Sequence, residues 1–157
     1  MIKFQFKIFL KASYEIILVF LQFLIIILHF FQLELIPQKQ IIQVSPLSYL
    51  VGFLIIIIAL LILLVAIKDL GRNLSPFPRP INNSNLVTTG IYQFTRHPMY
   101  YSLILISIGV FITKLSIYYL FLSISLGLII KFKIALEEQY LKNKFKNYLL
   151  YKNEVKY

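Results

Sequence analysis

The chain alternates between long apolar segments and shorter polar ones, and the lengths of the apolar segments predict membrane-spanning helices. Residues 16–33 and 47–67 contain no formally charged side chain. At about 1.5 Å of rise per residue, each segment comes close to the roughly 30 Å thickness of the hydrocarbon core of a bilayer. Two shorter apolar segments follow, 98–113 and 115–130, and only Lys114 separates them. The pattern therefore predicts four membrane passages, the last two forming a helical hairpin with Lys114 at its tip.

These segments predict one all-α domain: a polytopic membrane helical bundle with two spans, a C-terminal helical hairpin and a cytoplasmic amphipathic helix. After residue 130, Ile134, Leu141 and Phe145 fall near one helical stripe, and lysines fill much of the other side. Such a pattern is typical of a helix that continues out of a span and lies at the membrane surface. The expected boundaries are 14–36 for the first span, 47–68 for the second, 69–95 for a cytoplasmic loop, 96–131 for the hairpin and 132–157 for the amphipathic helix.

The expected loop, residues 69–95, is the one long polar stretch inside the domain. Gly71, Gly90 and three prolines interrupt it, and these residues resist a long regular helix. A loop of this length in a small protein is usually functional or disordered. Its apolar residues, among them Phe77 and Ile91, argue against disorder. We therefore expect a folded lid over the membrane face.

Composition and charge support the membrane assignment. Of the 157 residues, 59% are hydrophobic, mean hydropathy is +0.81 and net charge is +10. In a four-span arrangement, every Lys and Arg except Lys39 and Lys114 falls on the side that carries both termini. The positive-inside rule then predicts an integral, multi-pass membrane protein with both termini cytoplasmic. The charge also favours anionic lipid headgroups, whereas the apolar runs exclude a nucleic-acid partner. The absence of cysteine excludes disulfides, thiolate metal sites and a thiol nucleophile, and we expect no metal.

The first two spans offer few chemical candidates. Gln22 and His29 lie within the first apolar segment, and a single histidine there is more often a packed, hydrogen-bonded residue than a ligand. The second span is rich in Ile and Leu and indicates a lipid-facing scaffold.

The most informative polar sequence is RHPMY at residues 96–100, which leads into the third apolar segment. Pro98 suits the first turn of a helix, and the free N–H groups of that turn favour an anion such as an amino acid carboxylate. A basic residue and a proline that simply mark the entry into the membrane are the alternative interpretation.

The adjacent carboxylates Glu137 and Glu138 follow the fourth apolar segment. Neighbouring helical positions point about 100° apart, so the two cannot face one pocket equally. One alternative is a solvated charge ladder with Lys133 and Lys142, one turn away on either side. The other is that one carboxylate receives a cationic group while its neighbour orients another side chain. If the hairpin forms, these carboxylates and His97 meet at the same membrane surface.

Four motifs together resemble the isoprenylcysteine carboxyl methyltransferase family, which is related to the membrane phospholipid methyltransferases. They are LGRNLSP at 70–76, LVTTGIY at 86–92, RHPMY at 96–100 and EEQYL at 137–141. The resemblance covers about the C-terminal 90 residues. It implies that S-adenosylmethionine binds between the C-terminal helices and the loop before them, without a Rossmann sheet. The chain contains no G-x-G-x-x-G sequence, in agreement.

The resemblance also implies which residues form the site. Arg96, Lys133 and Glu138 are the catalytic candidates. Those implied to line the cofactor site are Ser84, Asn85, Leu86, Val87, Tyr92, His97, Pro98, Met99, Tyr100 and Glu137.

The chain departs from the family pattern at two places. Lys133 stands where the family commonly has an arginine thought to meet the substrate carboxylate, so the charge is kept and the bidentate fork is lost. After Phe145 the chain lacks the usual glycine, and the terminal helix is expected to dock differently.

The implied reaction is methyl transfer to a lipophilic acceptor that arrives from the bilayer. A carboxylate of isoprenylcysteine type is the first expectation, and it would pair with Lys133 or Arg96 without need of a general base. A phosphatidylethanolamine-type amine is the alternative, and Glu138 or His97 would then accept a proton. A non-catalytic membrane scaffold or transporter that kept the fold is the alternative of another class.

Overall fold

The predicted all-α class is confirmed. The computed structural model describes residues 2–31 and 40–156, and within these ranges the regular elements are helices, with no β-strand. The five α-helices are α1 (Ile2–Phe30), α2 (Pro46–Leu70), α3 (Pro98–Lys114), α4 (Ile117–Lys144) and α5 (Tyr148–Glu154), and the loop between α2 and α3 contains the 3-10 turns η1 (Gly71–Asn73) and η2 (Gly90–Gln93).

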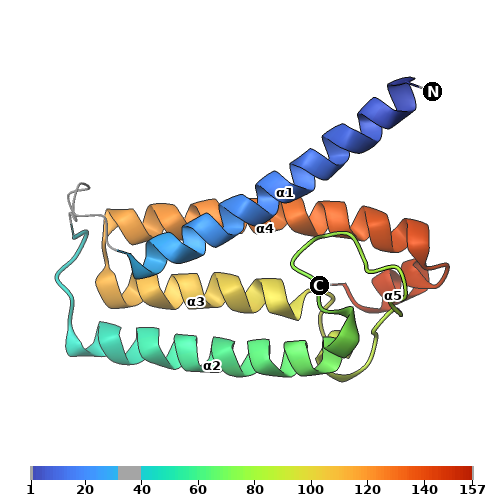
Figure 1. Ribbon diagram of the computed structural model, residues 1–157. Coiled ribbons are helices and arrows are strands. Elements are labelled where there is room, and N and C mark those ends of the chain that lie inside the picture. Colours follow the sequence, from blue (N-terminus) through green and yellow to red (C-terminus); the bar gives the residue numbers. More distant parts are fainter. Residues whose placement is uncertain (1, 32–39, 157) are drawn as a thin grey trace.

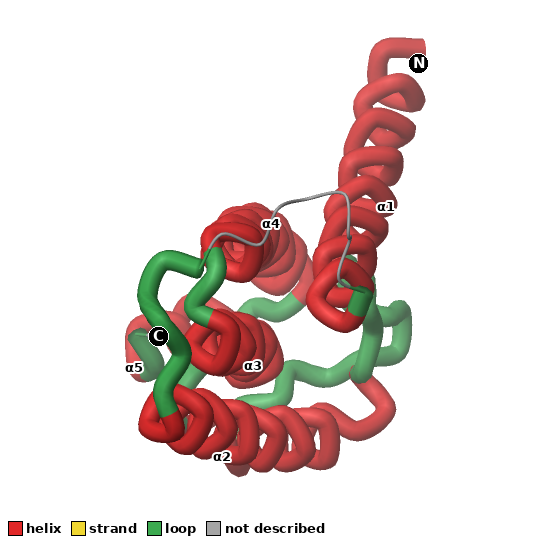
Figure 2. The backbone as a smooth tube through the Cα atoms, turned by 90° about the vertical axis from the view of Figure 1, so that its left-hand side faces the viewer, coloured by secondary structure: helices red, strands yellow, loops and turns green. Residues whose placement is uncertain are grey.

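The long helices α2, α3 and α4 pack in a row, and α1 lies beside this row (Figure 2). α3 packs against α2 on one side and α4 on the other, and α1 packs against α4 (Figures 1 and 2). α2, α3 and α4 run nearly along one direction, while α1 crosses α4 obliquely and its N-terminal end leaves the bundle (Figure 1). The loop between α2 and α3 lies at the same end of the bundle as α5 (Figure 1). The connection between α3 and α4 therefore lies at one end of the bundle. The loop between α2 and α3 lies with α5 at the other end, which we call the polar end (Figure 1).

Three helices of the described chain are long and apolar enough to cross a membrane, over Ser13–Phe30, Pro46–Asn73 and Ile117–Lys144. α3 is shorter, with 17 residues or about 26 Å of helix. The integral membrane character is thereby supported, while the count of four passages and the sidedness stay predictions. Residues 32–36 of the expected first span lie outside the described residues.

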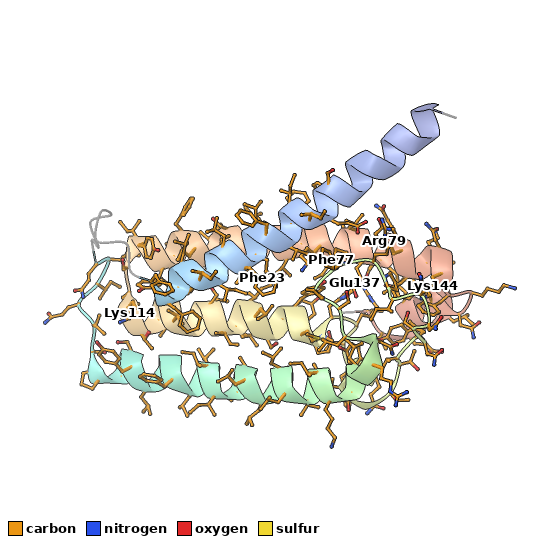
Figure 3. All side chains as sticks on the ribbon, viewed as in Figure 1. Phe23, Phe77, Arg79, Lys114, Glu137 and Lys144 are labelled. Carbon is orange, nitrogen blue, oxygen red and sulfur yellow. The ribbon has the colours of Figure 1, made fainter. Side chains whose placement is uncertain are left out.

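A tight turn joins α3 to α4, as the predicted hairpin requires. Leu115 adopts a left-handed conformation with φ of 45°, and its N–H donates to the Phe111 carbonyl at 2.7 Å. Ser116 then caps α4 by accepting from the backbone N–H of Tyr118 at 3.3 Å. Lys114, the last residue of α3, lies at the opposite end of the bundle from Glu137, Arg79 and Lys144 (Figure 3).

The second span is less featureless than its composition indicates. Most of its large side chains are exposed, as expected of a surface that faces lipid. Gly52, Ala59 and Ala66 are buried, seven residues apart, and they allow α2 to approach α3 closely. At the contact, a Cβ on Gly109 of α3 would lie 2.9 Å from the Gly52 carbonyl oxygen and 2.6 Å from Ile56 Cγ1.

The expected helix over 132–157 is divided, which corrects the predicted C-terminal boundary. Residues 132–144 continue α4 without a break, and the chain then turns. Phe145 takes an extended conformation with φ of −115° and ψ of 115°, and the N–H of Tyr148 donates to its carbonyl at 3.1 Å. The turn folds the short helix α5 back toward the polar end of the bundle, so that Tyr148 and Tyr151 become buried.

The close approach of α2 and α3 gives a direct test of the packing. We expect Gly109→Ala to destabilise the fold by about 1–3 kcal/mol, because the new methyl group meets backbone that cannot rotate away. Gly127→Ala in α4 is the matched control, since nothing lies within 4 Å of the position that its methyl group would take. It should be neutral or stabilising by about 0.5–1 kcal/mol. Thermal unfolding of the two variants in detergent measures both effects, and equal Tm values would contradict the assigned contact.

Candidate active site

A cavity of about 350 Å³ lies at the polar end of the bundle. This volume falls within the roughly 300–1,000 Å³ that is usual for small-molecule sites. Its walls come from α1, the end of α2, the loop, the start of α3, the last three turns of α4 and α5. The predicted site residues that line it are Ser84, Asn85, Leu86, Val87, Tyr92, Arg96, His97, Met99, Tyr100, Lys133 and Glu137.

The start of α3 forms one wall. His97 occupies the N-cap position without a side-chain capping bond, and Pro98 is the first helical residue. Met99 and Tyr100 follow in the first turn and line the cavity, whereas Pro98 is fully buried and does not. His97 is 4% exposed, and its imidazole lies 5.8 Å from the Tyr100 ring, centroid to centroid. The free N–H groups of this helix start are thus placed beside the cavity.

α4 forms the opposite wall through residues spaced by one turn. Lys133, Glu137 and Leu141 recur every four positions and line the cavity on one helix face. Glu138 is the next residue, so its side chain leaves in another direction and does not line the cavity. The carboxylates are separated as adjacent helical positions require, and Glu138 pairs with Arg96 and Lys152 rather than forming a ladder with Lys142.

Glu138 is the centre of a cluster formed by Arg96, Lys152 and His97. Its Oε1 lies 2.9 Å from Arg96 Nη2, 3.0 Å from Arg96 Nε and 3.5 Å from His97 Nε2. Its Oε2 pairs with Lys152. Arg96 Nη1 donates in addition to the carbonyl of Val155. The start of α3, the last turns of α4 and the segment around α5 are therefore joined through one carboxylate.

α5 closes the cavity with two tyrosines. Tyr148 and Tyr151 line it and are 1% and 6% exposed. The Tyr151 hydroxyl donates to the carbonyl of Tyr92 at 2.6 Å, which fixes α5 to η2. Burial raises the pKa of Tyr151 to about 12 and also raises the pKa of Tyr92 and Tyr148. These hydroxyls therefore stay protonated and able to donate at neutral pH.

The loop between α2 and α3 is folded against the helices, and its role as a lid stays a prediction. Asp69 accepts from the N–H of Ile91 at 2.8 Å, and Asn73 Oδ1 accepts from the N–H of Asn85 at 3.2 Å. Gly90 has φ of +64°, and a Cβ there would lie 2.1 Å from Asp69 Oδ2, so this turn requires glycine. A second set of bonds runs from Lys144 Nζ to the Ile81 carbonyl, the Asn82 carbonyl and Ser84 Oγ.

Comparison with known proteins gives the family. A family model described as phospholipid methyltransferase matches residues 47–148, more than half of the chain. The chain belongs to the phospholipid methyltransferase family. Comparisons with curated proteins and with solved structures gave no match.

Membership of the phospholipid methyltransferase family confirms the broader part of the resemblance, a family of membrane methyltransferases. It does not separate an isoprenylcysteine acceptor from a phospholipid acceptor. The matched residues contain α2 except for Pro46, the loop, α3 and α4, and they end at the first residue of α5. α1 and nearly all of α5 lie outside the match, although both contribute to the cavity.

Several residues around the cavity of this phospholipid methyltransferase family member were not predicted. Gln22 of α1 lines the cavity and accepts from Lys133 Nζ at 2.5 Å. Glu15, 5% exposed, pairs with Arg79 of the loop at 3.3 Å and accepts from the Tyr140 hydroxyl. One feature of the sequence could have indicated these residues: Glu15, Gln22 and His29 are seven residues apart and therefore share a helix face. His29 itself is packed and hydrogen-bonded, as expected, with Nε2 at 2.7 Å from Ser107 Oγ.

The cluster around Glu138 can be tested by neutralising its centre. Glu138→Gln should lower the free energy of unfolding by about 1–3 kcal/mol, because the largely buried guanidinium of Arg96 loses its counter-charge. It should also expose the chain after residue 145 to limited proteolysis. Lys152→Gln is the control, since its side chain is 42% exposed and the expected cost is below about 1 kcal/mol. Equal proteolysis of both variants and the unaltered protein would refute the assigned cluster.

Proposed function

We propose that this protein is an integral membrane methyltransferase that uses S-adenosylmethionine and acts on a lipophilic acceptor. The observation that carries the proposal is the cavity at one end of an apolar bundle, which His97, Tyr100 and Glu137 line together. These residues come from segments that are about 40 positions apart in the sequence. Membership of a membrane methyltransferase family supports the reaction class.

The groups around the cavity suit this cofactor chemically. The Glu137 carboxylate suits an ammonium group, and the N–H groups at the start of α3 suit a carboxylate. The aromatic rings of Tyr92 and Tyr148, with the amide side chain of Asn85, suit a nucleoside. When bound, S-adenosylmethionine supplies a methyl group on a positively charged sulfur atom. The residues of the chain then have to position the acceptor, exclude water and hold the charges.

Lys133 is the residue that we propose to bind the methyl acceptor. This residue is 1% exposed and lines the cavity, and its ammonium suits an anionic group of the acceptor. A carboxylate acceptor of isoprenylcysteine type would pair with this charge and needs no proton removed. We retain it as the first candidate.

A phospholipid amine is the second candidate, favoured by the description of the family. An amine acceptor loses a proton, and Glu137 is the carboxylate that lines the cavity. From the sequence, Glu138 or His97 was expected to accept that proton. His97 lines the cavity, whereas Glu138 does not and is engaged by Arg96 and Lys152. We therefore assign Arg96 and Glu138 a positioning role: they hold His97 and α5 in place around the cavity.

Cofactor binding tests the first step of this proposal. By calorimetry in detergent, we expect the protein to bind S-adenosylmethionine with a Kd in the micromolar range, the low end of usual enzyme KM values. Glu137→Gln and His97→Ala should each weaken binding by tenfold or more. Glu154→Gln removes an exposed carboxylate at the end of α5 and should bind as the unaltered protein does. Undiminished binding in both site variants would refute the site.

The chemistry of the product distinguishes the two acceptors. Membranes containing the protein would be incubated with S-adenosylmethionine labelled in its methyl group, and the lipids extracted. A carboxyl methyl ester releases labelled methanol in mild base, whereas an N-methylated phospholipid retains its label. We expect base-labile label that depends on this chain and is lost in Lys133→Met. Base-stable label would instead establish the amine acceptor, and either kind of label would eliminate a non-catalytic scaffold.

A further inference from the structure

Three polar side chains attach α1 to the rest of the protein. Glu15, Gln22 and His29 are spaced seven residues apart. Glu15 contacts Arg79 of the loop and Tyr140 of α4, Gln22 contacts Lys133 of α4, and His29 contacts Ser107 of α3. Between apolar helices in a membrane, such polar contacts are a main source of specific association. Of these contacts, the one made by Gln22 joins two residues that both line the cavity.

The surroundings of Lys133 show what Gln22 contributes. Within the described residues, the ammonium has two hydrogen-bond acceptors, Gln22 Oε1 at 2.5 Å and the Pro76 carbonyl at 3.0 Å. It also lies 5.3 Å from the centre of the Tyr100 ring. Both acceptors are neutral, and an ammonium has three N–H donors. The two bonds fix the position of the charge without neutralising it, and they leave one donor for a ligand.

We infer that Gln22 is a positioning residue, which holds the Lys133 ammonium against the cavity so that it meets the anionic group of the acceptor. The anionic group is a carboxylate or a phosphate, and the inference rests on the function proposed above. It implies that α1, although outside the matched residues 47–148, completes the acceptor part of the site. If Gln22 had a purely structural role and only held α1 to α4, then loosening α1 at another position should have the same effect as replacing Gln22.

His29 provides the control for that structural role. It anchors the same helix through Ser107, about 10 Å along the axis from Gln22, and it does not line the cavity. His29→Leu therefore weakens the attachment of α1 without removing a partner of Lys133. Gln22→Met keeps a side chain of similar length but removes the oxygen acceptor.

The first measurement is the reactivity of Lys133 with an amine-directed reagent, in detergent and without cofactor or acceptor, quantified by peptide mass spectrometry. The exposed lysines of the same protein serve as internal references. We expect labelling of Lys133 to rise several-fold in Gln22→Met and to stay unchanged in His29→Leu. Gln22→Glu keeps an oxygen acceptor at this position and should keep the labelling low. Equal labelling of Lys133 in all four proteins would overturn the inference.

The second measurement is the kinetics of methyl transfer to two acceptors, phosphatidylethanolamine in vesicles and a prenylated cysteine with a free carboxylate. For whichever acceptor is used, Gln22→Met should raise its KM about tenfold, with a smaller change in kcat and cofactor affinity within twofold. His29→Leu should leave both KM values within twofold of the unaltered protein. Matching effects of the two substitutions would overturn the inference. Transfer to neither acceptor by the unaltered protein would count against the proposed function, while Lys133 labelling still decides the role of Gln22.

Discussion

The ion pair between Arg96 and Glu138 joins the parts of the chain on which the site depends. Arg96 lies just before α3, Glu138 lies in the last turns of α4, and both side chains are largely shielded from solvent. Because Arg96 also donates to the Val155 carbonyl and Glu138 pairs with Lys152, the segment around α5 is held by the same charges. Glu137, one residue away, is thereby directed toward the cavity. Glu138 therefore holds the structure together, and Glu137 faces the cavity, where a ligand can contact it.

The apolar side chains make the helices long enough to cross a membrane but do little to determine which helices pack together. Small residues and buried polar side chains determine the packing. The glycines at the contact of α2 and α3 allow two backbones to approach, and Asp69 holds η2 next to the end of α2 through the N–H of Ile91. On the other side of the row, Ser107 and Ser123 bond to each other at 2.8 Å and His29 bonds to Ser107. In lipid, where burial of apolar surface does not favour one helix partner over another, such contacts decide which helix faces lie together.

The cavity combines opposite charges in a manner that suits methyl transfer to an anionic or amphipathic acceptor. Glu137 and Lys133 line the same wall one helical turn apart, and the structure gives Lys133 two neutral hydrogen-bond acceptors. A negative and a positive group at this spacing can hold a cationic cofactor group and an anionic acceptor group close together. The tyrosines of α5 and residues of the folded loop complete the lining of this space.

Much of this protein follows from the amino-acid order alone. Helix positions follow from apolar runs, and the start of α3 follows from His97-Pro98, because hydropathy and proline act locally. The spacing of the motifs also predicted that His97 and Glu137 lie at the same end of the bundle, because two consecutive helices of a hairpin return the chain to the end where it started. Tertiary structure alone decided that Phe145 breaks the last helix, that Glu138 binds Arg96 and that Gln22 meets Lys133, 111 positions away. These contacts depend on the rotation of each helix about its axis. Packing against neighbouring helices sets this rotation, and the hydropathy pattern of the sequence does not indicate it.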